Sequence, residues 1–233
     1  MWYILNFIIG AIFGSFLNVI IYRGVEGLSI KNPPRSFCPN CKTRLKWYDN
    51  IPILSFLILK GKCRYCGTKI SPRYLFIELI LSFGFLIHYI AFAFPIALIL
   101  DSLLFVTLAV IFIDLKIMMI PDFAWIVVGL AGFLDVFLNG DFLFRILAFS
   151  IVLLVLLILK FLYRDSLGSG DIFLMTAFSF LLSLPLAFYM MIISSVLGIL
   201  FAIVKRSKII PFGPFISLSG YILYILNVLY FLK

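Results

Sequence analysis

Long apolar runs separated by short polar segments make up most of this chain. A helix that crosses a bilayer needs roughly 20 apolar residues, and eight runs approach that length. They lie at about 1–22, 74–93, 96–115, 121–138, 142–163, 171–186, 187–204 and 212–232. The boundary near Pro185 is the least sharply marked. We therefore expect an all-α polytopic membrane protein with about eight transmembrane helices.

Composition strengthens this expectation. Of the 233 residues, 64% are hydrophobic and only 12% are charged. A soluble domain is about half apolar and about a quarter charged, so a water-soluble core of this size would not accommodate so much apolar surface. The composition therefore excludes a soluble globular protein and places the chain in the lipid bilayer.

The net charge of +9 resides in one segment. Residues 23–73 contain 11 Lys or Arg and two acids, whereas acids and bases balance in the rest of the chain. Because basic loops remain on the cytoplasmic side, we expect Met1 outside and this loop in the cytoplasm, and we favour this interpretation over nucleic-acid binding. The turns at 115–121, 160–171 and 205–211 hold most of the other basic residues, which agrees with eight spans. No basic residue precedes Arg23, so we do not expect a cleavable signal peptide.

The same loop contains the four cysteines of the chain, in two C-x-x-C pairs separated by 21 residues: Cys38, Cys41, Cys63 and Cys66. Two such pairs suit tetrahedral Zn²⁺. Disulfides are the alternative, which a reducing cytoplasm disfavours. Four thiolates fill the coordination shell, so we expect a structural zinc ion that folds a loop with little core of its own.

Acids within apolar runs are costly and each needs an explanation. Asp101, Asp135 and Asp141 fall near the outer ends of runs, where we expect water to solvate them. Asp122 follows Pro121 and is expected at a helix N-terminus.

Two further polar residues leave alternatives open. Glu78 lies five residues into the second run, and either reaches the interface or lines a site. His88 is the only histidine, and we expect a structural or interfacial role.

Asp114 and Asp171 form a pattern of their own. Each lies at the predicted cytoplasmic end of an apolar run, and 57 positions separate them. A helix N-cap would account for Asp171 alone, but it would not account for a second acid at matching depth. Paired carboxylates share one proton, so one can deprotonate an attacking water while the other protonates an oxyanion. The pair therefore predicts aspartic-protease chemistry, with Gly168 and Gly170 allowing close approach to Asp171.

These motifs carry a family resemblance. G-S-G-D at 168–171 resembles the GxGD signature of intramembrane-type aspartyl proteases, and D-L-K-x-x-x-I-P-D from Asp114 resembles the first catalytic motif of the type IV prepilin peptidases. Further matches follow the family order, at Gly14–Arg23, at Asp49–Ser55 with the cysteines, at Ile70–Tyr74 with Glu78, and at Pro211–Pro214.

The resemblance implies a bifunctional enzyme of the cell inner membrane. Such an enzyme cuts the leader of prepilins or pseudopilins after a glycine at the cytoplasmic face, and then N-methylates the new N-terminal residue with S-adenosylmethionine. It implies that Asp114 and Asp171 are the catalytic pair, supported by loop residues Lys116, Pro121, Gly168 and Gly170. It links the cysteine loop to methylation, with these candidate methyltransferase or substrate residues: Asn18, Asp49, Asn50 and Glu78. The implied organisation is a first transmembrane helix at 1–22, a zinc loop at 23–73 and a peptidase domain at 74–233.

Two features depart from the family pattern. Phe173 stands where the family often has Lys, and no glycine-rich nucleotide loop of the soluble methyltransferase kind is present in the sequence. A peptidase without methyltransferase activity is therefore one alternative. A non-enzymatic membrane assembly protein, or a transporter with paired acids, is another.

Overall fold

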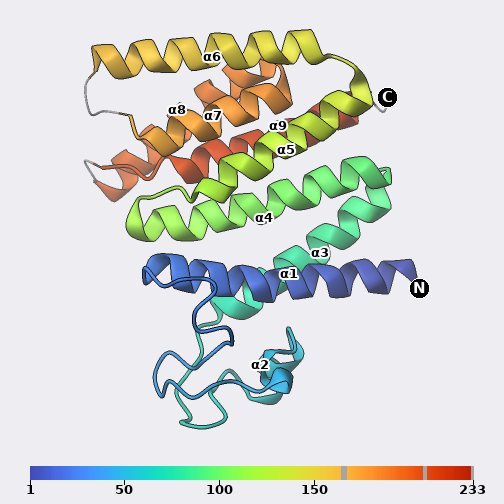
Figure 1. Cartoon of the computed structure of the whole chain (residues 1–233), viewed down its shortest axis with the longest axis vertical. Helices are drawn as coiled ribbons and strands as arrows, with labels where there is room; N and C mark the ends of the chain where they lie inside the picture. Colours follow the sequence, from blue (N-terminus) through green and yellow to red (C-terminus); the bar gives the residue numbers. More distant parts are fainter. Residues whose placement is uncertain (164–166, 207–208, 232–233) are drawn as a thin grey trace. The chain divides into compact units, whose positions relative to one another are not determined.

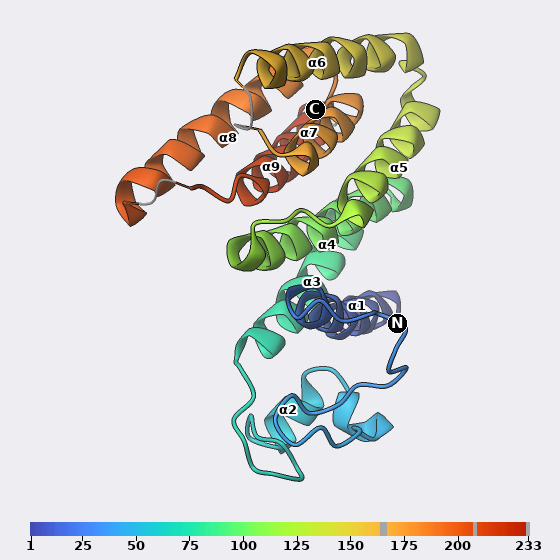
Figure 2. The ribbon, with the colours of Figure 1, turned by 60° about the vertical axis from the view of Figure 1, so that its left-hand side comes forward.

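The computed structural model describes residues 1–163, 167–206 and 209–231. The chain divides into two compact units, Met1–Ala97 and Leu98–Lys233. The described elements are helical (Figures 1 and 2). Two isolated β-bridges lie in the cysteine loop. This confirms the expected all-α class. Seven described helices are long and apolar enough to cross a membrane.

The first unit is built on two long helices, α1 (Trp2–Val25) and α3 (Arg73–Ala91). In sequence, the cysteine loop connects these two helices, and it contains a short 3-10 helix η1 (Trp47–Asn50) and α2 (Leu54–Ile58). Glycines on α1 allow the two long helices to touch. A Cβ atom on Gly10 would lie 2.5 Å from the carbonyl oxygen of Leu81, and one on Gly14 would lie 2.6 Å from the Cα of Glu78. Small residues thus permit close backbone approach, as in many membrane helix pairs.

The second unit holds α4 (Phe94–Ile117, whose first turn falls in the first unit), α5 (Asp122–Asn139), α6 (Phe142–Leu162), α7 (Ser169–Leu182), α8 (Leu184–Lys205) and α9 (Gly213–Phe231). Helix α7 is its centre, packing against α5, α6, α8 and α9 (Figures 1 and 2). Nine of its fourteen residues are buried. A helix that is buried on nearly all sides positions its N-terminal residues firmly within the unit.

The eight predicted apolar runs correspond to eight helices, but the sixth is shorter than expected. Helix α7 has 14 residues, which is about 21 Å of helix against a hydrocarbon core of about 30 Å. The predicted end at residue 186 is wrong. The helix ends at Leu182 because Ser183 has φ 69°, and Pro185 then lies in the first turn of α8, where a missing N–H costs nothing.

A buried ion pair joins the helices of the second unit. Asp135 on α5 accepts hydrogen bonds from Arg145 Nη2 at 2.7 Å and from the Tyr224 hydroxyl at 2.6 Å. Asp135 is 3% exposed and Arg145 is 4% exposed. The prediction that water solvates Asp135 is therefore wrong, because a buried arginine compensates its charge instead. The exposed Asp141 agrees with the prediction.

Other predictions of position are confirmed. Asp122 is the first residue of α5, with Pro121 as the residue before it. His88 is buried in the last turn of α3, as expected for a structural residue.

Candidate active site and metal centre

The first predicted catalytic residue, Asp114, lies near the end of α4 and is 4% exposed. Its Oδ2 accepts a hydrogen bond of 3.0 Å from the backbone N–H of Gly213, the first residue of α9. The N–H groups of the first helical turn lack partners within the helix, so a carboxylate is well placed to accept from one of them. Asp114 therefore ties the end of α4 to the start of α9.

Gly213 is required at this contact by shape. A Cβ atom there would lie 2.8 Å from Cγ1 of Val110, 2.9 Å from Oδ2 of Asp114 and 3.0 Å from Cδ1 of Ile120. Gly213 was not among the predicted site residues. The signal that could have identified it is the P-F-G-P segment at 211–214, where a glycine stands directly before a proline at the start of an apolar run.

The second predicted catalytic residue, Asp171, is the third residue of α7, and Gly168 is the N-cap. The alternative that Asp171 is itself the N-cap is therefore wrong. Its carboxylate reaches back to hydrogen-bond the backbone of Gly168, as an acid at the third helical position does in half of a capping box. A Cβ atom on Gly168 would lie 2.9 Å from Oδ2 of Asp171. Gly168 thus allows the carboxylate to approach the backbone closely.

The two aspartates meet at one place in the second unit. Ile120 lies beside both Gly170 and Gly213. A Cβ atom on Gly170 would lie 3.0 Å from Cβ of Ile120, and one on Gly213 would lie 3.0 Å from its Cδ1. The two carboxylates are close enough to interact electrostatically. Within residues 1–163, 167–206 and 209–231, neither forms an ion pair with a basic side chain. The arrangement is chemically suited to a carboxyl pair that shares one proton.

The other residues predicted to support this site have simpler surroundings. Lys116 is exposed in the last turn of α4, and Pro121 precedes α5. Phe173, which stands where the resembled family often has Lys, is 49% exposed and lies with its ring centroid 5.3 Å from that of Trp125. Position 173 therefore presents an aromatic surface two residues after Asp171.

The four cysteines converge in the first unit, where their Sγ atoms all lie within 4.8 Å of one another: Cys38, Cys41, Cys63 and Cys66. All four are free thiols, so the disulfide alternative is wrong for this structure. A tetrahedral ion with bonds of about 2.3 Å would place sulfur atoms about 3.8 Å apart, and the Sγ atoms of Cys38 and Cys66 lie 3.9 Å apart. The donor set therefore fits a metal ion.

The two C-x-x-C turns are built alike. Cys38 N–H donates to the carbonyl of Thr43 at 3.0 Å, and Cys63 N–H donates to the carbonyl of Thr68 at 2.8 Å. Each pair is followed by a residue with positive φ, Lys42 at 57° and Gly67 at 71°.

The four thiols of this cluster differ in their surroundings. Hydrogen bonds from the side chain and backbone of Thr68 lower the pKa of the Cys66 thiol to about 6. Burial raises the pKa of the Cys38 thiol to about 11.

Asp49 holds the cysteine loop together. Its carboxylate accepts hydrogen bonds from Arg64 Nε at 2.7 Å, from the Tyr65 hydroxyl at 3.1 Å and from the Lys46 backbone at 3.2 Å. Burial opposes ionisation of Asp49, but the Arg64, Lys46 and Tyr65 hydrogen bonds lower its pKa overall. The hydrogen-bond partners of the Asp49 carboxylate are therefore all residues of the cysteine loop.

Glu78 is 7% exposed, so the alternative that it reaches the interface is wrong. Its Oε2 accepts a hydrogen bond of 2.7 Å from the backbone N–H of Ile53, and its carboxylate also bonds the hydroxyl of Ser15. Ile53 has φ 63°, a rare conformation for a β-branched residue that costs of order 1–3 kcal/mol. Glu78 therefore fixes a strained turn. The candidate Asn18 is also buried and donates to the carbonyl of Tyr74 at 3.0 Å.

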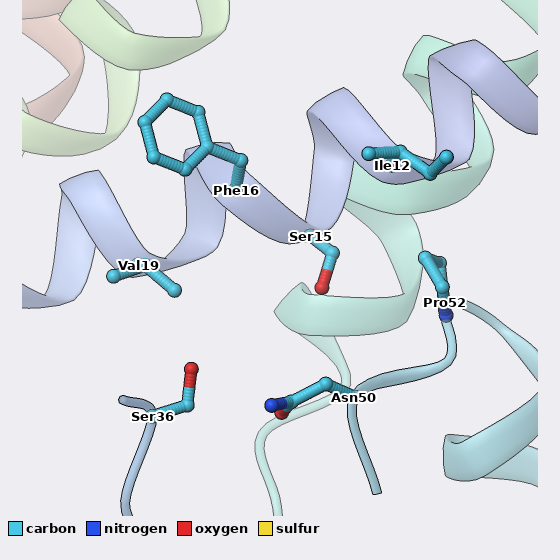
Figure 3. A pocket seen from close by; sticks show the side chains of 7 residues that line it. All are labelled: Ile12, Ser15, Phe16, Val19, Ser36, Asn50 and Pro52. Atoms are coloured by element: carbon cyan, nitrogen blue, oxygen red, sulfur yellow. The ribbon is translucent and has the colours of Figure 1, made fainter. Parts of the chain in front are cut away.

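A pocket of about 260 Å³ opens between α1 and the cysteine loop (Figure 3). Its lining residues are Ile12, Ser15, Phe16, Val19, Ser36, Asn50 and Pro52. The structure thus brings Asn50 close to Ser15, the hydrogen-bond partner of Glu78, and keeps Asp49 with Arg64.

Comparisons with known proteins cover both units. A model of the bacterial peptidase A24 N-terminal domain matches residues 8–92, and a model of the type IV leader peptidase family matches residues 101–203. A prepilin leader peptidase/N-methyltransferase of Vibrio cholerae is 32% identical over 96% of this chain and 96% of its own length. One of Neisseria gonorrhoeae is 31% identical over 94% of this chain and 89% of its own length. No solved structure matches the chain.

Proposed function

The chain belongs to the type IV leader peptidase family, and from this we propose that it is a membrane aspartic endopeptidase that removes the leader of type IV prepilins or pseudopilins and then N-methylates the new N-terminus. The resemblance predicted from the sequence motifs is thus confirmed. The names of the relatives include both a leader peptidase and an N-methyltransferase activity, and we propose both activities for this chain.

The pairing of Asp114 and Asp171 carries the proposed cleavage. Both carboxylates belong to the second unit and interact electrostatically. Ile120 lies close to a glycine beside each of them, Gly170 and Gly213. Neither carboxylate has a basic partner among the described residues. One ionised carboxylate takes a proton from water as that water attacks the scissile carbonyl, and the protonated partner supports the developing oxyanion. Gly168 and Gly213 allow the backbone to pack closely against the two carboxylates, since a Cβ atom at either position would lie 2.9 Å from a carboxylate oxygen.

The proposed orientation places this site at the cytoplasmic face. The basic loop at 23–73 is retained in the cytoplasm, and threading the helices back and forth brings the end of α4 and the start of α7 to that side. A prepilin would then keep its apolar helix in the bilayer and present its leader to the aspartates. An assembly protein or an ion transporter would instead need acids deep within its helices with polar paths on both sides.

The four thiolates would hold a structural Zn²⁺, since soft sulfur donors in tetrahedral arrangement suit that ion and the Sγ atoms lie within 4.8 Å. A full shell leaves no position for substrate, so the ion would act by folding the loop. The methyl donor S-adenosylmethionine would supply an electrophilic methyl group. Ser15, Asn50 and Glu78 are the residues of this unit that we assign to the methylation step.

Intact-mass analysis of purified protein incubated with a panel of prepilins tests the function. We expect loss of the leader without the methyl donor, and a further gain of one methyl group with it. Cleavage without any methylation would support a peptidase lacking the second activity. Intact prepilin in every reaction would contradict the proposal as a whole.

A further inference from the structure

The pocket between α1 and the cysteine loop has two chemically distinct ends (Figure 3). Ile12, Phe16 and Val19 form an apolar wall along α1. Opposite and beside them, the polar ends of Ser15, Ser36 and Asn50 converge on the same space, as Figure 3 shows. A ligand for this pocket therefore has a small polar group attached to an apolar body.

Ser15 determines which polar group fits. Its hydroxyl bonds the carboxylate of Glu78, so its proton is committed and its remaining lone pairs can only accept. Glu78 is held in turn by the N–H of Ile53, whose strained backbone persists because its surroundings fix it. The pocket thus offers a fixed acceptor with a carboxylate directly behind it.

The charge around the pocket favours a cationic donor as well. The segment 23–73 contains 11 Lys or Arg, yet none of them lines this pocket. Arg23 is committed to backbone carbonyls, with bonds of 2.9 Å to Ser29 and 2.7 Å to Pro33, and Arg64 is committed to Asp49. A hydrogen-bonded acceptor backed by a carboxylate, with no lining basic group, suits an amine.

We propose that this pocket binds the free N-terminal amine of the cleaved pilin, that is, the α-amino group that leader removal creates on an apolar transmembrane peptide. This proposal rests on the proposed function, and it assigns a binding site to the cleaved pilin, the substrate of the methylation step. The apolar wall continues along α1 at a spacing of four residues, since Ile8, Ile12 and Phe16 are 48%, 54% and 49% exposed. That stripe fits the helix of such a peptide while its terminal amine lies at Ser15.

Binding is measurable without any methyl transfer. The full-length protein in nanodiscs carries a photoreactive phenylalanine analogue at position 16, and no methyl donor is added. The probes are two synthetic apolar 25-residue peptides that begin with Phe, one with a free amine and one N-acetylated. We expect the free amine to bind at least about tenfold more tightly, which is the lower end of what a charge-assisted hydrogen bond contributes.

Variants locate the preference within the pocket. Ser15→Ala and Glu78→Gln should reduce the tenfold preference to less than twofold, and Ser29→Ala, a change at an exposed loop serine outside the pocket, should leave it intact. Metal content equal to that of the wild-type protein verifies that each variant retains the loop fold. Should Ser15→Ala fail this criterion, Asn50→Ala, at an exposed residue, tests the same pocket.

Equal binding of the two peptides by the wild-type protein would overturn the proposal. So would variants that weaken binding of S-adenosylmethionine and leave the peptide preference unchanged, because the pocket would then belong to the methyl donor. Methylation by the wild-type protein is followed in parallel by intact mass. Its absence with every peptide would contradict the proposed function, whereas loss of the amine preference alone would contradict only the assignment of this pocket.

Discussion

The second unit contains two buried carboxylate sites that differ in what surrounds the charge. Asp135 is 3% exposed and is bonded to Arg145 and Tyr224, at 2.7 Å and 2.6 Å. Asp114 is 4% exposed and accepts from the backbone of Gly213, and its electrostatic neighbour Asp171 is a second acid. One site pairs opposite charges across helices, and the other places like charges together.

Under the proposed function, this difference distinguishes a structural acid from a catalytic one. A buried acid with a buried arginine is held in a fixed, satisfied arrangement, and a change there acts on folding. Two neighbouring carboxyl groups that have no basic partner among the described residues can share a proton that moves during a reaction, and the adjoining glycines let the chain pack closely around them. Burial of an acid alone would not have separated the two cases.

The largest expected effect follows from removing one carboxylate of the pair. Asp114→Asn or Asp171→Asn should lower prepilin cleavage by roughly 10³-fold or more, because the asparagine amide cannot exchange the shared proton. Gel analysis of prepilin processing measures this, and thermal unfolding in detergent should remain near the wild-type midpoint. Either variant processing prepilin at near wild-type rate would show that the pair is not catalytic.

Removal of one partner at the other site should act on stability. Asp135→Asn leaves Arg145 buried without its counter-charge, which costs about 3–5 kcal/mol. We expect a lower unfolding midpoint, while the protein that remains folded cleaves prepilin at an ordinary rate. A variant of wild-type stability that has lost cleavage would reverse the roles assigned to the two sites.

A smaller effect should follow from crowding one carboxylate of the pair. Gly213→Ala would place a methyl group 2.9 Å from Oδ2 of Asp114, so the carboxylate or the start of α9 must shift. We expect cleavage to fall by roughly 10²-fold, as for other small displacements of reacting groups. Gly129→Ala is the matched control, because a Cβ there meets nothing within 4 Å, and it should not impair cleavage.

The smallest effect on cleavage is expected from the cysteine cluster. Cys63→Ser removes one of four thiol ligands, so bound zinc should fall well below one ion per chain and the loop should become more sensitive to protease. Cleavage should be partly retained, because Asp114 and Asp171 belong to the other unit. Metal analysis of the purified variant measures the first result, and unchanged metal content would contradict a four-thiolate site.

The sequence was sufficient for the features that depend on local pattern. Runs of about 20 apolar residues predicted the helices, and the spacing of Cys38, Cys41, Cys63 and Cys66 predicted a cluster that the structure brings within 4.8 Å. The depth of Asp114 and Asp171 in their runs predicted that they would meet. Hydrophobic length, ligand spacing and helix-end position are all properties that neighbours along the chain determine.

Tertiary structure decided which acids are satisfied and by what. Arg145 compensates Asp135 from another helix, Gly213 donates to Asp114 across 99 positions, and Ile53 and Ser15 bind Glu78 from separate segments. Position in an apolar run indicates only that a charge is costly there. The group that offsets this desolvation cost belongs to a residue that folding brings into contact with the acid. Hydropathy along the chain does not identify that residue.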